Sequence, residues 1–142
     1  MFLFYFSIAL TVVANIFYHL LQKVIPGGVN PVLSLTATYL TAALASLLLF
    51  PLFPTTEGWL TELKRVNWTS YALGISIIGL ELGFLLAYRA GWKISLGALI
   101  SNATVSILLV PLGLFFFREK VSAVNVIGIG VAVAGLVMMN HR

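Results

Sequence analysis

A single carboxylate stands in the middle of a long apolar stretch of this chain. Glu81 lies in the segment Gly79-Leu80-Glu81-Leu82-Gly83, and the other acidic residues fall outside the long apolar stretches. A charged side chain inside a bilayer is costly, so it is a functional candidate that faces a cavity or a partner. A low-dielectric site favours the neutral form of a carboxyl group. Glu81 is therefore a candidate to bind a proton, a cation or a substrate and to release it when the site is hydrated.

An alternative role for Glu81 is structural, with its carboxyl hydrogen-bonded between helices or paired with Arg89 or Lys93. Arg89 is eight residues further on, about 12 Å along a helix axis at 1.5 Å per residue, so we expect no direct pair within one helix. An ion pair between Glu81 of one chain and a basic residue of a second chain is a remaining alternative. Tyr88 follows Glu81 by seven residues on the same helical face and is predicted to form an aromatic wall for a cationic or aromatic solute.

Polar residues form a stripe along the first apolar stretch. The stripe consists of Thr11, Asn15, Tyr18 and Gln22. This spacing is one face of a helix, and in a membrane a polar face points into the helix bundle or into water. Asn15, Tyr18 and the adjacent His19 are predicted to line a cavity. His19 could titrate near neutral pH, or it could be a neutral imidazole bonded to a neighbouring helix. A bis-histidine haem is not expected, because the other histidine, His141, lies almost at the end of the sequence.

The remaining polar residues are divided between candidate contacts and packing. Asn102 shares a helical face with Ser95 and Ser106 and is predicted to contact substrate. Serine and threonine in membrane helices usually serve packing, and this applies to the hydroxyl residues of the second apolar stretch. These are Ser34, Thr38 and Thr41, together with Tyr39.

Small residues predict helix packing at two places. Gly79 and Gly83 have the spacing that permits close backbone approach, and the last apolar stretch carries a ridge of small residues. The ridge consists of Gly128, Ala132 and Gly135. It is a predicted packing seam within one chain or between two chains. Pro111 is either a hinge for alternating access or an ordinary tolerated kink.

Composition determines which elements must position these residues. The chain has 142 residues, of which 61% are hydrophobic and 8% charged, whereas soluble domains have about 45–50% apolar and about 25% charged residues. A bilayer-crossing helix needs about 20 apolar residues. Long apolar stretches and the breaks between them predict five such helices, at residues 2–25, 32–53, 70–92, 95–117 and 121–140. We therefore expect an all-α integral membrane protein with a single domain over residues 1–142.

Several function classes have no support in the sequence. There is no cysteine, so disulfides and thiolate metal sites are absent, and no hydrolase, phosphate-binding or metal motif is present. The start of the chain lacks the basic region of a secretory signal and is expected to be a retained first helix. We expect no enzyme activity, no cofactor and no nucleic-acid partner.

The longest connection, residues 55–69, carries apolar residues near helical spacing beside charged ones. It is either a short helix in the membrane interface or a solvated loop. The three tryptophans, Trp59, Trp68 and Trp92, fall at span ends, as an aromatic belt requires.

The basic residues do not favour one orientation in the membrane. With five spans, the eight Lys and Arg divide evenly, four on each side. Orientation normally follows an excess of Lys and Arg on the cytoplasmic side. Either a weaker cue sets the orientation, or the chain inserts both ways and pairs as an antiparallel dimer. Two oppositely inserted chains would form a ten-helix body with the geometry of inverted-repeat transporters.

The last third of the chain resembles the C-terminal half of an EamA-type domain of the drug/metabolite transporter superfamily. The resemblance rests on Leu96-Gly97-Ala98-Leu99-Ile100, Pro111, Phe117-Arg118-Glu119-Lys120-Val121-Ser122 and the glycine-rich stretch that follows. The five-span length also matches one EamA unit. The resemblance implies a dimer of inverted units, related to the antiparallel small multidrug resistance proteins.

The same resemblance bears on two acidic positions. Glu119 matches the family's acid at the junction of the fourth and fifth helices and is expected to be structural. Small multidrug resistance proteins carry a coupling glutamate in the first helix, with a lysine eight residues later. When the first helices are superposed, this chain has Asn15 at the position of that glutamate and Lys23 at the position of that lysine. Glu81 could replace that acid from another helix, or solutes could move down their own gradients.

These observations predict a secondary transporter subunit in the cell membrane, inner or plasma, that moves a small organic solute by alternating access. The expected solute is a metabolite, an amino acid or an amphipathic cation, and the expected partner is a second, similar five-helix chain in a homodimer or heterodimer. Two alternatives stay open: a subunit of a lipid or lipid-linked sugar flippase, and a membrane subunit that only assembles a partner.

Overall fold

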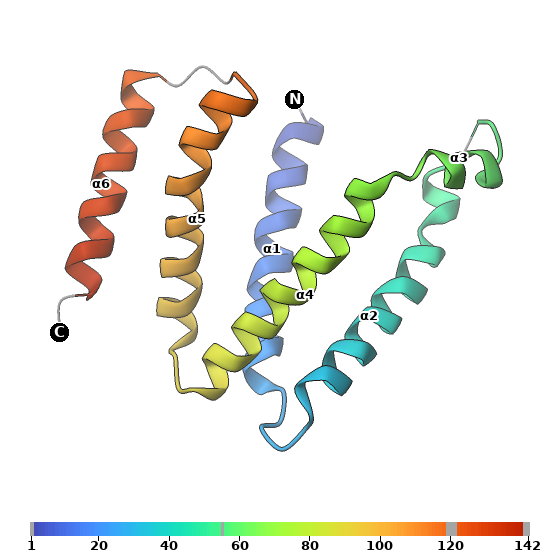
Figure 1. Cartoon of the computed structure of the whole chain (residues 1–142), viewed down its shortest axis with the longest axis horizontal. Coiled ribbons are helices and arrows are strands. Elements are labelled where there is room, and N and C mark those ends of the chain that lie inside the picture. Colours follow the sequence, from blue (N-terminus) through green and yellow to red (C-terminus); the bar gives the residue numbers. More distant parts are fainter. Residues whose placement is uncertain (1, 55, 119–121, 141–142) are drawn as a thin grey trace. The chain divides into compact units, whose positions relative to one another are not determined.

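The computed structural model describes residues 2–54, 56–118 and 122–140, and these residues form helices without a strand (Figure 1). The predicted all-helical membrane fold is confirmed. Four helices are long and apolar enough to cross a membrane: α1 (Phe2–Val24), the segment Pro31–Leu52, α4 (Trp68–Arg89) and α5 (Ile94–Phe116). The last helix, α6 (Ala123–Asn140), contributes a shorter apolar stretch, Ala123–Gly135. Glu119, Lys120, Val121 and His141 lie outside the described residues.

The second predicted span, residues 32–53, is not one continuous α-helix. α2 runs over Pro31–Leu48, and a 3₁₀ turn, Phe50–Leu52, completes the segment. Pro51 has no backbone N–H, and its ring disfavours a helical conformation at the residue before it. The start of α2 is well capped, because the Asn30 side chain accepts hydrogen bonds from the backbone N–H groups of Val32 at 2.9 Å and Leu33 at 3.3 Å.

Of the two structures proposed for residues 55–69, the described part of this connection contains the short helix. α3 spans Trp59–Arg65, and Asn67 caps the start of α4 by accepting a hydrogen bond from the Thr69 N–H at 3.0 Å. Arg65 pairs with Glu62 at 3.1 Å and also with Glu57. These exposed ion pairs contribute little to stability.

The chain divides into two compact units, one up to Gly91 and one from Trp92 onward. Gly91 has a φ of +99°, a left-handed conformation that suits glycine and ends α4. In the first unit α4 contacts both α1 and α2, while the backbones of α1 and α2 stay apart over the described residues (Figure 1). In the second unit α5 packs against α6, and α5 is continuous through Pro111.

Among the residues whose burial the structure describes, few side chains are buried, and these gather around α4 in the first unit. They are His19 and Gln22 of α1, Leu35 of α2, and Glu81, Phe84, Leu85 and Tyr88 of α4. Most large apolar side chains face outward, for example Phe2 at 80% exposure and Leu48 at 79%. An apolar surface of this extent suits lipid or a partner chain rather than water. The interior of the first unit is therefore organised around the stretch of α4 that contains Glu81.

The predicted small-residue seams make no close contact within the described part of the chain. A Cβ atom added at Gly79, Gly83, Gly128 or Gly135 would meet no neighbouring atom within 4 Å, and Ala132 is exposed. These faces are therefore open towards lipid or another chain.

Candidate functional site

A groove lies between α1 and α2, with Glu81 of α4 on its floor. Its volume is about 710 Å³, within the range of about 300–1,000 Å³ typical of sites for small organic molecules. The polar residues of the lining are Tyr18, Gln22, Ser34, Thr38, Thr41 and Glu81. The apolar residues are Leu21, Val24, Ile25, Pro26, Ala37, Ala42 and Ala45. We call this cavity the α1–α2 groove. It combines an apolar wall with a small number of polar groups, which suits an amphipathic ligand.

Glu81 is almost fully buried at 9% exposure, and its Oε2 atom has no hydrogen-bond partner among the described residues. The Tyr39 hydroxyl lies beside the carboxyl without reaching hydrogen-bond geometry, and Tyr18 is close enough to interact with it electrostatically. Side chains from α1, α2 and α4 thus meet at one carboxyl group. This convergence is the feature of the groove that could support chemistry.

His19 and Tyr88 lie at the contact between α1 and α4, and neither lines the α1–α2 groove. The Tyr88 hydroxyl and His19 Nδ1 are 2.9 Å apart and share a hydrogen bond. The Phe84 ring packs against both, with its centroid 4.7 Å from that of His19 and 5.9 Å from that of Tyr88. This geometry matches the alternative for His19, an imidazole bonded to a neighbouring helix. The pair joins α1 to α4 next to Tyr18, which lines the groove.

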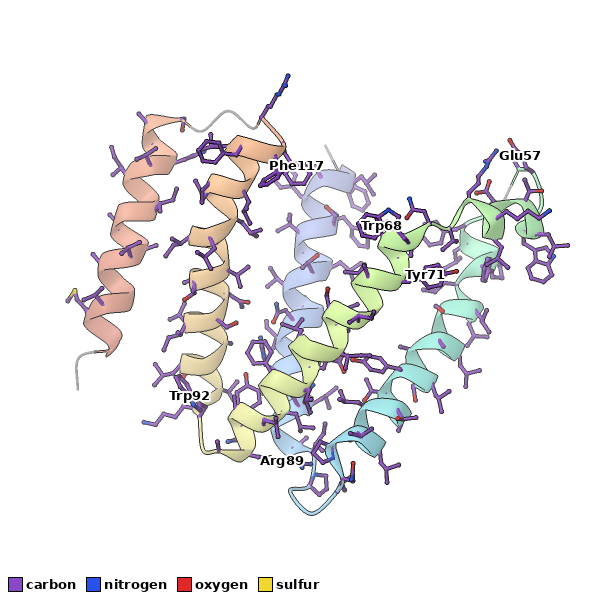
Figure 2. The ribbon with its side chains drawn as sticks, in the orientation of Figure 1. Glu57, Trp68, Tyr71, Arg89, Trp92 and Phe117 are labelled. Carbon is purple, nitrogen blue, oxygen red and sulfur yellow. The ribbon has the colours of Figure 1, made fainter. Side chains whose placement is uncertain are left out.

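Further contacts join the ends of α1 and α4. Lys23 Nζ donates to the Tyr88 carbonyl oxygen at 3.1 Å and lies 5.7 Å from the centroid of the Tyr88 ring. Arg89 Nη2 donates to the carbonyl oxygens of Val29 at 2.8 Å and Pro26 at 3.2 Å, beside the turn between α1 and α2 (Figure 2). The guanidinium is thereby engaged by the turn, and within this chain it forms no ion pair with Glu81 among the described residues.

The structure does not bring all the predicted site residues together. Asn15 is exposed on α1, above the part of the helix that lines the groove. Asn102 is exposed on α5 in the second unit, where its backbone carbonyl oxygen accepts a hydrogen bond from Ser106 Oγ at 2.8 Å. Their predicted contacts with substrate remain predictions. Of the six predicted residues, Tyr18 and Glu81 line the groove, and His19 and Tyr88 support it.

Three hydroxyl residues of α2 line the groove, although serine and threonine in membrane helices are expected to serve packing. Ser34, Thr38 and Thr41 recur at the same helical spacing as the polar stripe of α1, and this repetition was the signal for a second polar face. Two of these hydroxyls also bond to their own helix, from Thr38 to the Ser34 carbonyl at 3.1 Å and from Thr41 to the Ala37 carbonyl at 2.9 Å. Tyr39, on the same helix, lies beside Glu81.

The described residues contain no group of three or more His, Cys, Asp or Glu side chains that could hold a metal ion. Long apolar helices around a groove with a buried acid define the chain as an all-helical integral membrane protein with a candidate ligand site in its interior.

Comparison with known proteins gives the family. The chain is 32% identical over 104 residues to a probable 4-amino-4-deoxy-L-arabinose-phosphoundecaprenol flippase subunit ArnE from Hamiltonella defensa, over 67% of this chain and 94% of that protein. The chain therefore belongs to the family of the ArnE flippase subunits.

Two longer relatives match most of the chain. These UPF0324 membrane proteins, from Listeria monocytogenes and Listeria innocua, are each 28% identical over 136 residues, or 95% of this chain. The chain spans 39% of the length of each of these relatives. No family model and no solved structure matches the chain.

Proposed function

We propose that the chain is a subunit of a membrane transporter or flippase of the drug/metabolite transporter superfamily, with one EamA-type unit, in the cell membrane. Its substrate occupies the α1–α2 groove during alternating access. The observation that carries this proposal is the groove itself, which places a buried and unpartnered carboxyl oxygen of Glu81 on the floor of a cavity of about 710 Å³. Secondary transporters commonly hold substrate in such a site between membrane helices.

An amphipathic, lipid-linked molecule is the substrate class that we favour over a freely soluble metabolite or amino acid. The relative from Hamiltonella defensa is named as a subunit of a flippase for a phosphoundecaprenol-linked sugar. The groove also suits a molecule with an apolar part, because its lining combines aliphatic side chains of α1 and α2 with hydroxyl groups that lie mostly on α2. A polar head would face Glu81 while an apolar chain follows the aliphatic wall.

The groove distinguishes this proposal from that of a subunit which only assembles a partner. A purely structural subunit is expected to have closely packed helices and a fully paired Glu81. Instead, α1 and α2 stand apart over the described residues, and Glu81 Oε2 has no partner there. Both features support a role in ligand binding.

Filling the groove tests the proposal. We expect the substitution Ala42→Trp to reduce substrate transport in proteoliposomes at least about tenfold, because an indole would occupy the groove. A loss of about 1.4 kcal/mol in the free energy of substrate binding is enough to lower the affinity tenfold. Lipid-linked sugars and soluble metabolites are offered in parallel. The control is Ala43→Trp, since Ala43 is exposed and does not line the groove. Equal transport by the two variants would contradict a path through the groove.

For the assembly we propose an antiparallel pair, either of two copies or with a similar five-helix chain. Two observations support it. One is the even division of all eight Lys and Arg between the two sides of a five-span chain. In the first unit the basic residues also divide evenly, with Lys23 and Arg89 at one end and Lys64 and Arg65 on α3 near the other (Figure 1). This leaves no orientation bias in that unit.

Dual insertion predicts that reporters fused after residue 142 are active on both sides of the membrane. We expect an alkaline phosphatase fusion and a fluorescent protein fusion to give comparable activity, because the bias in Lys and Arg that normally sets orientation is missing. Adding three lysines to one connection should make one reporter dominate. Activity of only one reporter in the unaltered chain would exclude the antiparallel homodimer and leave the heterodimer.

A further inference from the structure

Four buried oxygen atoms without hydrogen-bond partners converge in the first unit. Within the described part of the chain these atoms are Tyr18 Oη, Gln22 Oε1, Tyr39 Oη and Glu81 Oε2. They belong to three helices, and Glu81 interacts electrostatically with both tyrosines. A buried polar atom without a partner costs about 1–3 kcal/mol. Tyr18 and Tyr39 adjoin the Glu81 carboxyl group, and Gln22 adjoins Tyr18, so a ligand bound among these side chains would supply the missing partners.

We propose that Glu81, Gln22 and Tyr18, which line the α1–α2 groove, form a binding site for one monovalent cation together with Tyr39, which lies beside Glu81. Its function rests on the proposed transport role, because the cation would occupy the same groove as the substrate. The binding itself can be measured without transport.

The chemistry of the four atoms favours a cation. A carboxylate and an amide oxygen only accept hydrogen bonds, while a tyrosine hydroxyl can accept as well as donate. The site therefore has more acceptors than donors. Gln22 and Glu81 both line the groove and are more than nine-tenths buried, at 7% and 9% exposure. Their unpartnered oxygens thus belong to side chains that border an accessible cavity.

The charge of the site favours a monovalent ion. An ionised Glu81 carries one negative charge, and no described residue forms an ion pair with it. The nearest guanidinium on its helix, that of Arg89, binds the carbonyl oxygens of Pro26 and Val29. One positive charge would neutralise the carboxylate, whereas a divalent ion would leave a net charge in a low-dielectric site, which is costly. The ring of Tyr18 adds an aromatic surface suited to an ammonium group.

Two sources can supply this cation: an inorganic ion such as Na⁺, or a protonated amine on an amphipathic molecule. The test uses the purified full chain in lipid nanodiscs, titrated with NaCl, KCl or methylammonium chloride, with the midpoint of thermal unfolding as readout. A ligand that binds only the folded state raises this midpoint in a saturable way. We expect a saturable rise in the parent chain with Na⁺, with methylammonium, or with both, and the response identifies the source.

The variants decide whether the four residues form the site. We expect Glu81→Gln to weaken cation binding at least about tenfold, and Gln22→Leu and Tyr39→Phe to weaken it about three- to tenfold, because each removes one ligand oxygen. The matched control is Glu62→Gln, which changes an acid on α3 outside the groove and should leave binding unchanged. If Glu81→Gln does not fold, the comparison of Gln22→Leu and Tyr39→Phe with the parent chain decides whether these residues bind the cation.

The results separate this inference from the proposed function. No saturable rise with any of the three salts, or an equal rise in the parent and in the Glu81, Gln22 and Tyr39 variants, would overturn the cation site. Transport by the parent in proteoliposomes would still support the proposed function in that case. Conversely, saturable cation binding that depends on these residues, in a chain that moves no substrate with its partner present, would contradict the transport role and leave the binding site established.

Discussion

Replacing Glu81 by glutamine is expected to lower the rate of substrate transport at least about tenfold at saturating substrate. The substitution keeps the size of the side chain and removes its charge. Interactions with a charged group contribute about 1.5–3 kcal/mol, and each 1.4 kcal/mol is a factor of about ten. Because Glu81 borders the groove and its Oε2 atom is unpartnered among the described residues, this energy is available to a ligand.

The measurement is uptake or lipid flipping in proteoliposomes, with equal amounts of folded protein verified by size-exclusion chromatography. Glu81→Asp should recover part of the activity, because it restores the charge on a shorter side chain. Glu62→Gln, on the exposed α3 helix, should behave like the parent. Unchanged transport by Glu81→Gln would remove Glu81 from the transport mechanism and would favour the structural role for this acid.

Leu85→Ala is expected to lower the free energy of unfolding by about 2 kcal/mol, the lower end of the range for buried leucines. Leu85 is 1% exposed and is the most deeply buried side chain of the described residues. In a soluble protein part of the cost comes from removing apolar atoms from water. In a bilayer the alternative environment is lipid, so the main cost is the packing lost around the cavity.

This stability change can be measured by denaturant or heat unfolding of the reconstituted chain. The control is Leu86→Ala, on the next residue of α4, because Leu86 is 49% exposed and should lose little packing within the chain. Equal destabilisation by the two substitutions would indicate that the open face of α4 is covered by a partner chain as tightly as the face towards α1.

The class of fold was predictable from the sequence because membrane helices are specified locally. A stretch of about 20 apolar residues must satisfy its backbone hydrogen bonds internally, and a helix does this without reference to the rest of the chain. Pro26-Gly27-Gly28 and Asn30-Pro31 therefore marked the turn between α1 and α2. The exception was the break before Pro51, where a 3₁₀ turn replaced the last turn of the predicted helix.

The candidate site was predictable only in part. Glu81 and Tyr18 stood out because a polar group in an apolar segment requires an explanation, and both line the groove. The roles of His19 and Tyr88 depended on the tertiary structure. The two residues are 69 positions apart, and the sequence pattern does not predict the hydrogen bond between their side chains. Helical spacing places a residue on a face, whereas the rotation of each helix against its neighbour determines what that face meets.

The sequence by itself therefore determined a membrane protein with five apolar segments, a single intramembrane acid and an even division of basic residues. Only the tertiary structure decided that α4 contacts α1 and α2 while these two stand apart, and that the resulting groove brings Gln22 and Glu81 to one cavity. The physical reason is that hydrophobicity is a local property of each segment, whereas the groove depends on side-chain packing between helices far apart in the chain.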